Sequence, residues 1–168
     1  MANEFIGFYQ GLLGVDSQCA TIDLIVVDSS PKVSFEQSRF LFKVVSKEKI
    51  KSTIFTIGED KSPGPDGFTT FFFKKAWNSV GDLFCDAVLE FFHSGSLLKS
   101  VNNTTVMLIP KSARTSLVQD FWPISCYNIT YKVISKVLAA WLAPIISSLI
   151  DQTQWHLFKV EVWWITSI

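Results

Sequence analysis

Apolar residues recur along most of the chain at intervals of three and four, the spacing of one helix face. A first such repeat occupies residues 4–13 and ends at Gly14, and a later one places Ile50, Ile54 and Ile57 on one face. The pattern predicts helices over residues 4–13, 34–44, 46–57, 68–80, 82–94 and 128–142, and a short last helix to about residue 150.

Capping residues and helix breakers set the expected ends of these helices. Ser34 and Gln37 have the spacing of a capping box, and Ser46 can cap the helix that follows. Gly81 is expected to separate the two helices of residues 68–94, and Pro144 to start or kink the last one.

Two short segments are β-branched and apolar. Residues 104–109 predict a strand that runs into Pro110 and Lys111, and residues 22–27 form a β-branched run between polar turns. Residues 112–119 are expected to be a polar loop.

Aromatic residues are abundant, with 15 Phe and 6 Trp in 168 residues of which 48% are hydrophobic. Helical spacing favours a core position for the stripe that includes Phe71, Phe72 and Phe84, rather than a surface on which nucleic-acid bases stack. So large an apolar content also predicts exposed apolar surface and self-association.

The formal net charge is zero, which provides no overall attraction to nucleic acid. Residues 91–150 nevertheless carry five basic residues and a single acidic one, Asp120. This asymmetry suits a phosphate-binding surface, although scattered bases also mark solvated faces.

Cysteine and histidine show no metal-ligand spacing. Cys19, Cys85 and Cys126 form no CxxC pair, and His93 and His156 stand alone. We therefore expect reduced thiols and no metal site in an intracellular protein, nuclear or cytoplasmic.

No targeting signal is visible in these residues. The N-terminal residues lack a basic flank and a long apolar core, so secretion is not expected, and the Asn-x-Thr matches at Asn102, Asn103 and Asn128 then have no meaning for glycosylation. The longest uncharged stretch, residues 137–150, is shorter than the ~20 residues that cross a bilayer. A buried helix and no membrane partner are expected.

The densest run of turn-forming residues is Lys-Ser-Pro-Gly-Pro-Asp-Gly-Phe at residues 61–68. Each Pro fixes its own φ, and the glycines allow turns that other residues resist. Asp66 stands where an N-cap of the next helix would stand. A stiff loop that leads into a helix N-terminus can meet phosphate oxygens, and an ordinary connecting turn is the alternative.

Three blocks stand in order along the chain: SPGPDGFTTFFFKKAWNSVGD, VLEFFHSGSLLKSVNNTTVMLIPK and DFWPISCYNITYKVISKVLA. Together they resemble the start of the reverse transcriptase domain of LINE-type, non-LTR retrotransposons, in the form found in flowering plants. The resemblance extends back through VSKEKIKSTIFTIGEDK and faintly to FIGFYQGLLG, and covers most of residues 5–154.

The resemblance implies a helix-rich α+β fold, the fingers and the start of the palm of a right-hand polymerase, with a small antiparallel sheet. It implies an N-terminal helical extension over residues 1–45, a partial reverse transcriptase domain over residues 46–154 and a divergent Trp-rich tail over residues 155–168.

In this family, RNA-directed DNA polymerisation uses two Mg²⁺ ions held by a palm Asp and a later Tyr-x-Asp-Asp turn. Neither motif occurs here, and Asp66, Asp120 and Asp151 have no partner carboxylate at useful spacing. We therefore expect no catalytic residue, no metal ligand and no cofactor in this chain, which is predicted to be inactive alone.

What the resemblance implies instead is substrate positioning. Lys111, at the end of LIPK, stands where the family contacts the incoming nucleotide, with a solvated loop lysine as the alternative. Trp122 stands at the position of an Arg in the family, and an indole cannot replace a guanidinium on phosphate, so nucleotide binding is expected to be impaired. The implied template-binding residues are Pro63, Gly64, Pro65, Asp66 and Gly67.

Two further departures affect basic residues. Residues 140–143 read Ala-Trp-Leu-Ala where the family has Asn-Arg-Leu-Lys. The run Gln-x-Ala-Phe-x-x-Gly-Arg that the family has after Asp151 becomes Gln-Trp-His-Leu-Phe at residues 154–158, and an unrelated Trp-rich tail follows. These changes suggest the hypothesis of a decaying retroelement copy. The implied partners are an RNA template and an RNA/DNA hybrid. The alternative functions are a non-catalytic RNA-binding remnant and a host-adopted protein-interaction module.

Overall fold

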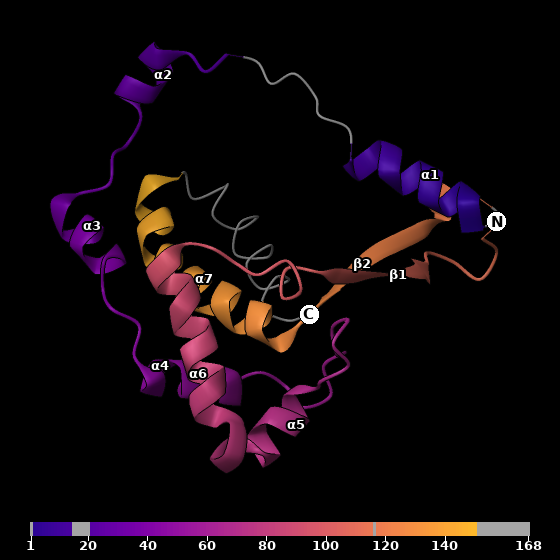
Figure 1. Ribbon diagram of the computed structural model, residues 1–168. Coiled ribbons are helices and arrows are strands. Elements are labelled where there is room, and N and C mark those ends of the chain that lie inside the picture. Colours follow the sequence, from indigo (N-terminus) through magenta and orange to yellow (C-terminus); the bar gives the residue numbers. More distant parts are fainter. Residues whose placement is uncertain (1, 15–20, 116, 151–168) are drawn as a thin grey trace. The chain divides into compact units, whose positions relative to one another are not determined.

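The computed structural model describes residues 2–14, 21–115 and 117–150 (Figure 1). The elements in chain order are α1 (Ala2–Leu13), α2 (Leu24–Ser29), α3 (Phe35–Leu41), α4 (Lys47–Phe55), α5 (Thr70–Lys75), α6 (Trp77–Ser94), β1 (Thr104–Pro110), the 3₁₀ turn η1 (Val118–Asp120), β2 (Phe121–Tyr127) and α7 (Ile129–Leu149). The fold is α+β and rich in helices, and β1 and β2 pair in a small antiparallel sheet, as predicted.

Internal contacts divide the chain into two compact units. The first comprises the residues up to Ser30 together with Val106–Ile124, and the second comprises Pro31–Thr105 and the residues from Ser125 onward. The domain boundaries that the resemblance implies, near residues 45 and 154, stay predictions.

In the first unit, α1 packs on the start of β2. The Phe5 and Phe121 rings meet edge to face with centroids 5.1 Å apart, and the Tyr9 hydroxyl donates a hydrogen bond to the Phe121 carbonyl oxygen at 3.2 Å. The predicted apolar stripe of the N-terminal helix is therefore used in packing.

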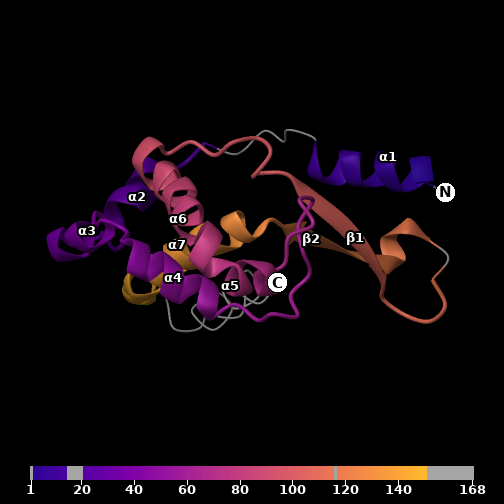
Figure 2. The same cartoon turned by 60° about the horizontal axis from the view of Figure 1, so that its bottom comes forward.

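In the second unit, the core lies among α4, α6 and α7, which run close together in both views (Figures 1 and 2). Ile50 and Ile54 of α4, Val88 of α6, and Val133 and Val137 of α7 are fully buried. Because burying one such side chain is worth about 1.5–3 kcal/mol, these positions drive the packing of the three helices.

The predicted capping signals of α3 and α4 are confirmed. Ser34 Oγ accepts a hydrogen bond from the Gln37 backbone N–H at 3.2 Å, and Gln37 Oε1 accepts one from the Ser34 backbone N–H at 2.8 Å. Ser46 Oγ accepts from the Lys49 backbone N–H at 3.2 Å. These bonds satisfy backbone donors that have no partner inside the first turn of a helix.

The predicted helix break at Gly81 is wrong. α5 ends at Lys75, α6 begins at Trp77, and Gly81 is buried inside α6. A β-carbon at Gly81 would lie 2.7 Å from Trp77 Cε2. The glycine therefore lets the indole pack directly on the helix backbone instead of ending the helix.

Two other segments differ from the pattern-based prediction. Helix α2 begins inside the β-branched run, where Asp23 Oδ1 accepts a hydrogen bond from the Ile25 backbone N–H at 2.9 Å and caps the helix. Strand β2 is not among the predicted elements, and it contains Pro123, which cannot donate to a ladder. The sheet accepts it because each strand of a two-stranded sheet has an unpaired edge.

Helix α7 continues through Pro144 to Leu149, so Pro144 does not start a separate helix. Among the described residues, α7 is the one helix whose length and composition would allow it to span a membrane. Its first half is part of the core, where Ile129, Val133 and Val137 are fully buried.

The aromatic residues of α5 and α6 divide into two groups. Phe84 is buried and Phe73 packs against the core. Phe68, Phe71 and Phe72, in contrast, are 46%, 49% and 39% exposed. The prediction of a core position is therefore wrong for Phe71 and Phe72, because the short α5 turns Thr70 and Phe73 inward instead.

Candidate functional site

The run of turn-forming residues, which we call the Pro-Gly loop (Lys61–Gly67), connects α4 to α5 in the second unit. Its last four residues form a turn closed by a hydrogen bond from the Gly67 N–H to the Gly64 carbonyl oxygen at 3.0 Å. Pro65 takes the second position of this turn, where its fixed φ is favourable. Gly67 has a φ of 74°, a conformation that side chains disfavour.

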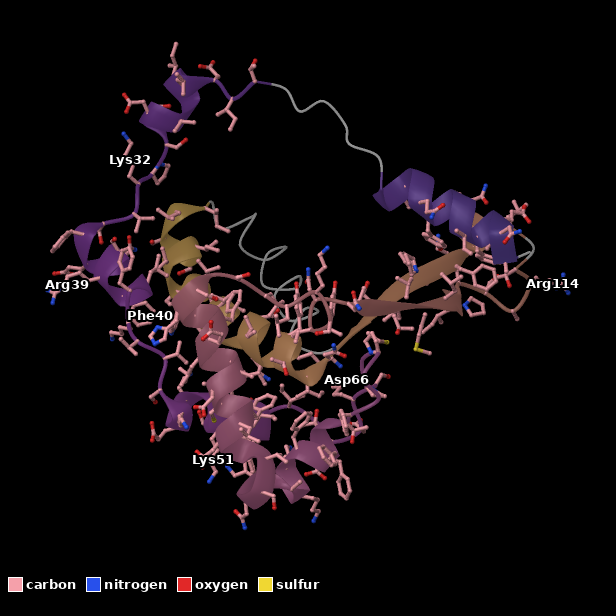
Figure 3. All side chains as sticks on the ribbon, in the orientation of Figure 1. Lys32, Arg39, Phe40, Lys51, Asp66 and Arg114 are labelled. Atoms are coloured by element: carbon pink, nitrogen blue, oxygen red, sulfur yellow. The ribbon has the colours of Figure 1, made fainter. Side chains whose placement is uncertain are left out.

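Asp66 does not cap α5, contrary to the prediction. It is exposed on the Pro-Gly loop (Figure 3), and its Oδ1 accepts a hydrogen bond from the Phe68 N–H at 3.0 Å. The N-cap is Thr69, whose Oγ1 accepts from the Phe72 N–H at 3.3 Å. The carboxylate thus stabilises the loop itself, three residues before the helix cap.

Asn128, the residue before α7, attaches the Pro-Gly loop to this helix. Its side chain is 3% exposed, and Oδ1 accepts a hydrogen bond from the Asp66 N–H at 3.2 Å. Its Nδ2 donates to the carbonyl oxygens of Ser100 and Val101 at 3.0 and 3.3 Å. One amide therefore joins three segments that are distant in sequence.

Lys132, one helical turn further along α7, makes a second attachment. This buried side chain donates a hydrogen bond from Nζ to the Ser62 carbonyl oxygen at 2.8 Å. Burial lowers the pKa of Lys132, and the positive charge of Lys61 lowers it further, while Cys126 and Asp66 oppose the shift.

Lys136, on the next turn of α7, belongs to the same cationic group. Burial lowers its pKa, and Lys61 lowers it further. Lys61, Lys132 and Lys136 thus form a cluster of like charges, which we call the lysine cluster, at the junction of the Pro-Gly loop and α7. Because the positive charge of Lys61 disfavours the charged forms of Lys132 and Lys136, an anion bound near Lys61 would oppose that effect.

Lys111 and Trp122 lie together in the first unit, at the end of β1 and in β2. The Lys111 ammonium stands 4.7 Å from the centroid of the Trp122 ring, and Nζ also donates to the Gln119 carbonyl oxygen at 2.6 Å. Such a cation–π contact is worth about 0.5–1 kcal/mol at an exposed site. The assignment of both residues to nucleotide binding stays a prediction.

The Pro-Gly loop and the Lys111–Trp122 pair fall in different compact units, and each is described by itself. Asn128 and Lys132 were missed as functional candidates. A polar residue directly before a long apolar helix was the available signal at Asn128, whereas an inward-facing lysine has no signature in the sequence.

Metal-ligating side chains do not gather in the part of the chain that the structure describes, where no group of three His, Cys, Asp or Glu side chains could hold an ion. Cys85 and Cys126 are buried free thiols. Cys19, Asp151 and His156 lie outside the described residues.

Comparison with known proteins gives an informative similarity. No family model matches the chain. The chain is 26% identical over 147 residues to a protein of Xenopus laevis named "Transposon TX1 uncharacterized 149 kDa protein". The match covers 88% of this chain but only 11% of that protein. This similarity supports a transposon-related origin for the chain.

Proposed function

We propose that this chain is an RNA-positioning part of a reverse-transcriptase-like protein, derived from a LINE-type, non-LTR retrotransposon of plant type. In this proposal it corresponds to the fingers and the front of the palm. The observation that carries the proposal is the Pro-Gly loop held by Asn128 and Lys132 against α7, beside the lysine cluster. The similarity to a transposon-encoded protein over most of the chain supports the same origin.

The physical reason lies in the lysine cluster. Lys132 and Lys136 are partly desolvated, and both carry their charge close to Lys61. A phosphate group beside them would add an attraction that opposes the repulsion from Lys61. A rigid loop next to such a cluster binds a nucleic-acid backbone without reordering, which lowers the entropic cost of binding.

The proposed role is binding and not catalysis. The 168 residues contain neither an Asp-Asp pair nor a Tyr-x-Asp-Asp turn. Two-metal phosphoryl transfer needs carboxylates that hold both ions. We therefore propose that polymerisation by the purified chain is absent, and Mg²⁺-dependent extension of a primer by this chain would contradict that part.

The binding test uses fluorescence anisotropy of a labelled single-stranded RNA of about 20 nucleotides, titrated with the full chain at several salt concentrations. Affinity should fall as salt rises, with a log–log slope of about −0.7 for each phosphate contacted on a single strand. The Lys61→Ala/Lys136→Ala variant should bind more weakly and with a shallower slope.

The matched control is Lys32→Ala/Lys49→Ala, which removes two exposed lysines of the same unit that do not belong to the cluster. It should bind like the wild type. Absence of salt-dependent RNA binding by the wild type, or an equal loss in both double variants, would overturn the proposal.

A second candidate function is self-association, which one apolar groove favours. This groove of about 400 Å³ is lined by residues 41–45 and by side chains of α6 and α7 that include Leu89, Phe92 and Trp141. Phe42 and Val44 on its rim are 84% and 86% exposed. Light scattering should then show a dimer that is insensitive to salt and is lost in Phe42→Ser/Val44→Ser.

A further inference from the structure

We propose that the exposed side of α5 is a stacking surface for the unpaired bases of single-stranded RNA. We call this surface the α5 platform and define it by Phe68, Phe71, Phe72 and Lys75. The inference rests on the proposed function, because it assumes that the chain binds RNA, and it adds a specific site and a preference for single strands.

The first observation is a pair of exposed rings in contact with each other. Phe68 and Phe72 have ring centroids 4.8 Å apart and planes inclined by 34°. Both side chains are more than a third exposed. Exposed aromatic faces of this kind are what unpaired bases stack on in sequence-tolerant nucleic-acid binding.

The second observation is that the core supports these rings from behind. Phe73 contacts Phe68 and Phe72 with centroid distances of 6.0 and 5.3 Å, and it contacts Phe84 at 4.9 Å. Phe84 is only 6% exposed. The outer rings are thus held on a fixed base, so stacking of a nucleobase would cost little side-chain entropy.

The third observation is the charge beside the rings. Lys75 Nζ stands 5.5 Å from the centroid of the Phe71 ring, and both side chains are exposed. Residues 67–81 include Lys74 and Lys75 and no acidic residue. Lys75 can therefore meet a phosphate while a neighbouring base covers a ring.

Lys74, unlike Lys75, is not part of the exposed platform. Its side chain is only 13% exposed, its Nζ donates to the Ile57 carbonyl oxygen at 2.8 Å, and Glu59 lies 3.7 Å away. Lys74 therefore connects α5 to the end of α4 and steadies the platform. The acidic residue nearest to the platform in sequence is Asp66. Its Oδ1 accepts a hydrogen bond from the Phe68 N–H.

These features favour single-stranded RNA over a duplex or a protein. In a duplex the base faces are already stacked on one another and cannot cover a phenylalanine ring. A protein partner of an aromatic patch gains nothing from the adjacent lysine unless it is acidic. A single strand offers both free base faces and a continuous row of phosphates.

The test compares the full chain with four variants: Phe68→Ala/Phe72→Ala, Phe72→Trp, Lys75→Ala, and Leu83→Ala as the control. Leu83 is 72% exposed on α6 and takes no part in the ring contacts. Each protein is titrated into single-stranded RNA with an internal 2-aminopurine, whose fluorescence reports stacking, and into an RNA duplex of equal length. Circular dichroism melting curves verify that each variant is folded.

The Phe68→Ala/Phe72→Ala variant should bind single-stranded RNA about tenfold or more weakly, with loss of the 2-aminopurine response, and should bind the duplex as the wild type does. Phe72→Trp should retain or strengthen binding, and Leu83→Ala should leave it unchanged. Lys75→Ala should weaken binding and make the salt slope shallower by about 0.7.

Failure of the two proposals can be told apart. If the wild type binds RNA and the Phe68→Ala/Phe72→Ala variant matches it, the α5 platform is wrong and the proposed function stands. An equal loss of single-strand and duplex binding in the double variant would also overturn the platform. If the wild type binds no RNA, both proposals are wrong.

Discussion

Gly64 and Asn128 lie in direct backbone contact although they are 64 residues apart in the sequence. A β-carbon at Gly64 would stand 2.6 Å from Asn128 Cα and closer still to the Asn128 backbone nitrogen and Oδ1. The need for glycine at position 64 therefore comes from this close approach and not from a left-handed φ, which in the Pro-Gly loop belongs to Gly67. The contact sets how closely the loop can approach α7.

Gly64→Ala should destabilise the fold, because the new methyl group meets backbone that cannot rotate away. We expect a loss of about 1–3 kcal/mol in the free energy of unfolding, the usual cost of overpacking. Urea denaturation measures it. The control is Gly7→Ala in α1, where a β-carbon meets nothing within 4 Å. That change should stabilise the helix by about 0.5–1 kcal/mol. Equal effects at both positions would contradict the close approach.

Asn128→Ala should cost about 1–3 kcal/mol, because the buried amide loses three hydrogen bonds to backbone groups. The carbonyl groups of Ser100 and Val101 and the N–H of Asp66 lose their hydrogen bonds. Hydrogen exchange should show faster exchange of the Asp66 amide. Asn102→Ala, at an exposed asparagine, should change stability by less than about 0.5 kcal/mol. A neutral Asn128→Ala variant would show that the loop is held by other contacts.

The lowered pKa of Lys132 makes stability depend on pH in a defined direction. Below its pKa in the folded state, the buried amine must be charged, and the full cost of that burial is present. Between that pKa and the value of 10.5 for an ordinary lysine, the unfolded chain binds more protons than the folded one, so stability rises with pH. The stability of the wild type relative to Lys132→Met should therefore increase as pH rises toward this value.

The measurement is urea denaturation from about pH 7 to about pH 10, the side on which lysine begins to lose its proton. Lys99→Met, at an exposed lysine, provides the comparison. The quantity compared is the free energy of unfolding of the wild type minus that of Lys132→Met. If this difference stays constant or falls as pH rises, Lys132 is solvated in solution.

Thr70→Val should stabilise the protein. The Thr70 hydroxyl is fully buried and has no hydrogen-bond partner among the described residues. A methyl group of the same shape removes the desolvation cost of that hydroxyl, a gain of about 1 kcal/mol. Thr53→Val is the matched change, because the buried Thr53 Oγ1 donates to the Lys49 carbonyl oxygen at 2.7 Å. Thr53→Val should lower the melting temperature of the protein, whereas Thr70→Val should raise it. Thermal melting curves of both variants measure this difference.

Features set by neighbours in sequence could be predicted well. The caps at Ser34 and Ser46 and the strand β1 depend on residues within one or two turns, so the sequence pattern identifies them. Gly81 was misread because a glycine inside a helix can serve packing, here with Trp77, as well as termination. The thirteen-residue pattern at residues 68–80 likewise did not show that α5 stops after Lys75.

The candidate site was predictable only in part. Its stiff loop is visible in the sequence as Pro63, Gly64 and Pro65. Its attachments are not, because Asn128 and Lys132 reach the loop across 62 and 70 residues. Pairings at such separation depend on how α4 and α7 pack, which periodicity does not specify.

Pro144 has one further consequence for α7. A proline offers no N–H to the carbonyl four residues earlier, so the Ala140 oxygen lacks its usual helical partner. Ala140 is exposed, so water can take that place. The residues before this gap are anchored by Val133 and Val137, whereas the last turns are joined to α3 by a bond from Gln37 to Ser148. α7 therefore contains two segments with different packing, one held in the core by Val133 and Val137 and one bonded to α3 through Ser148.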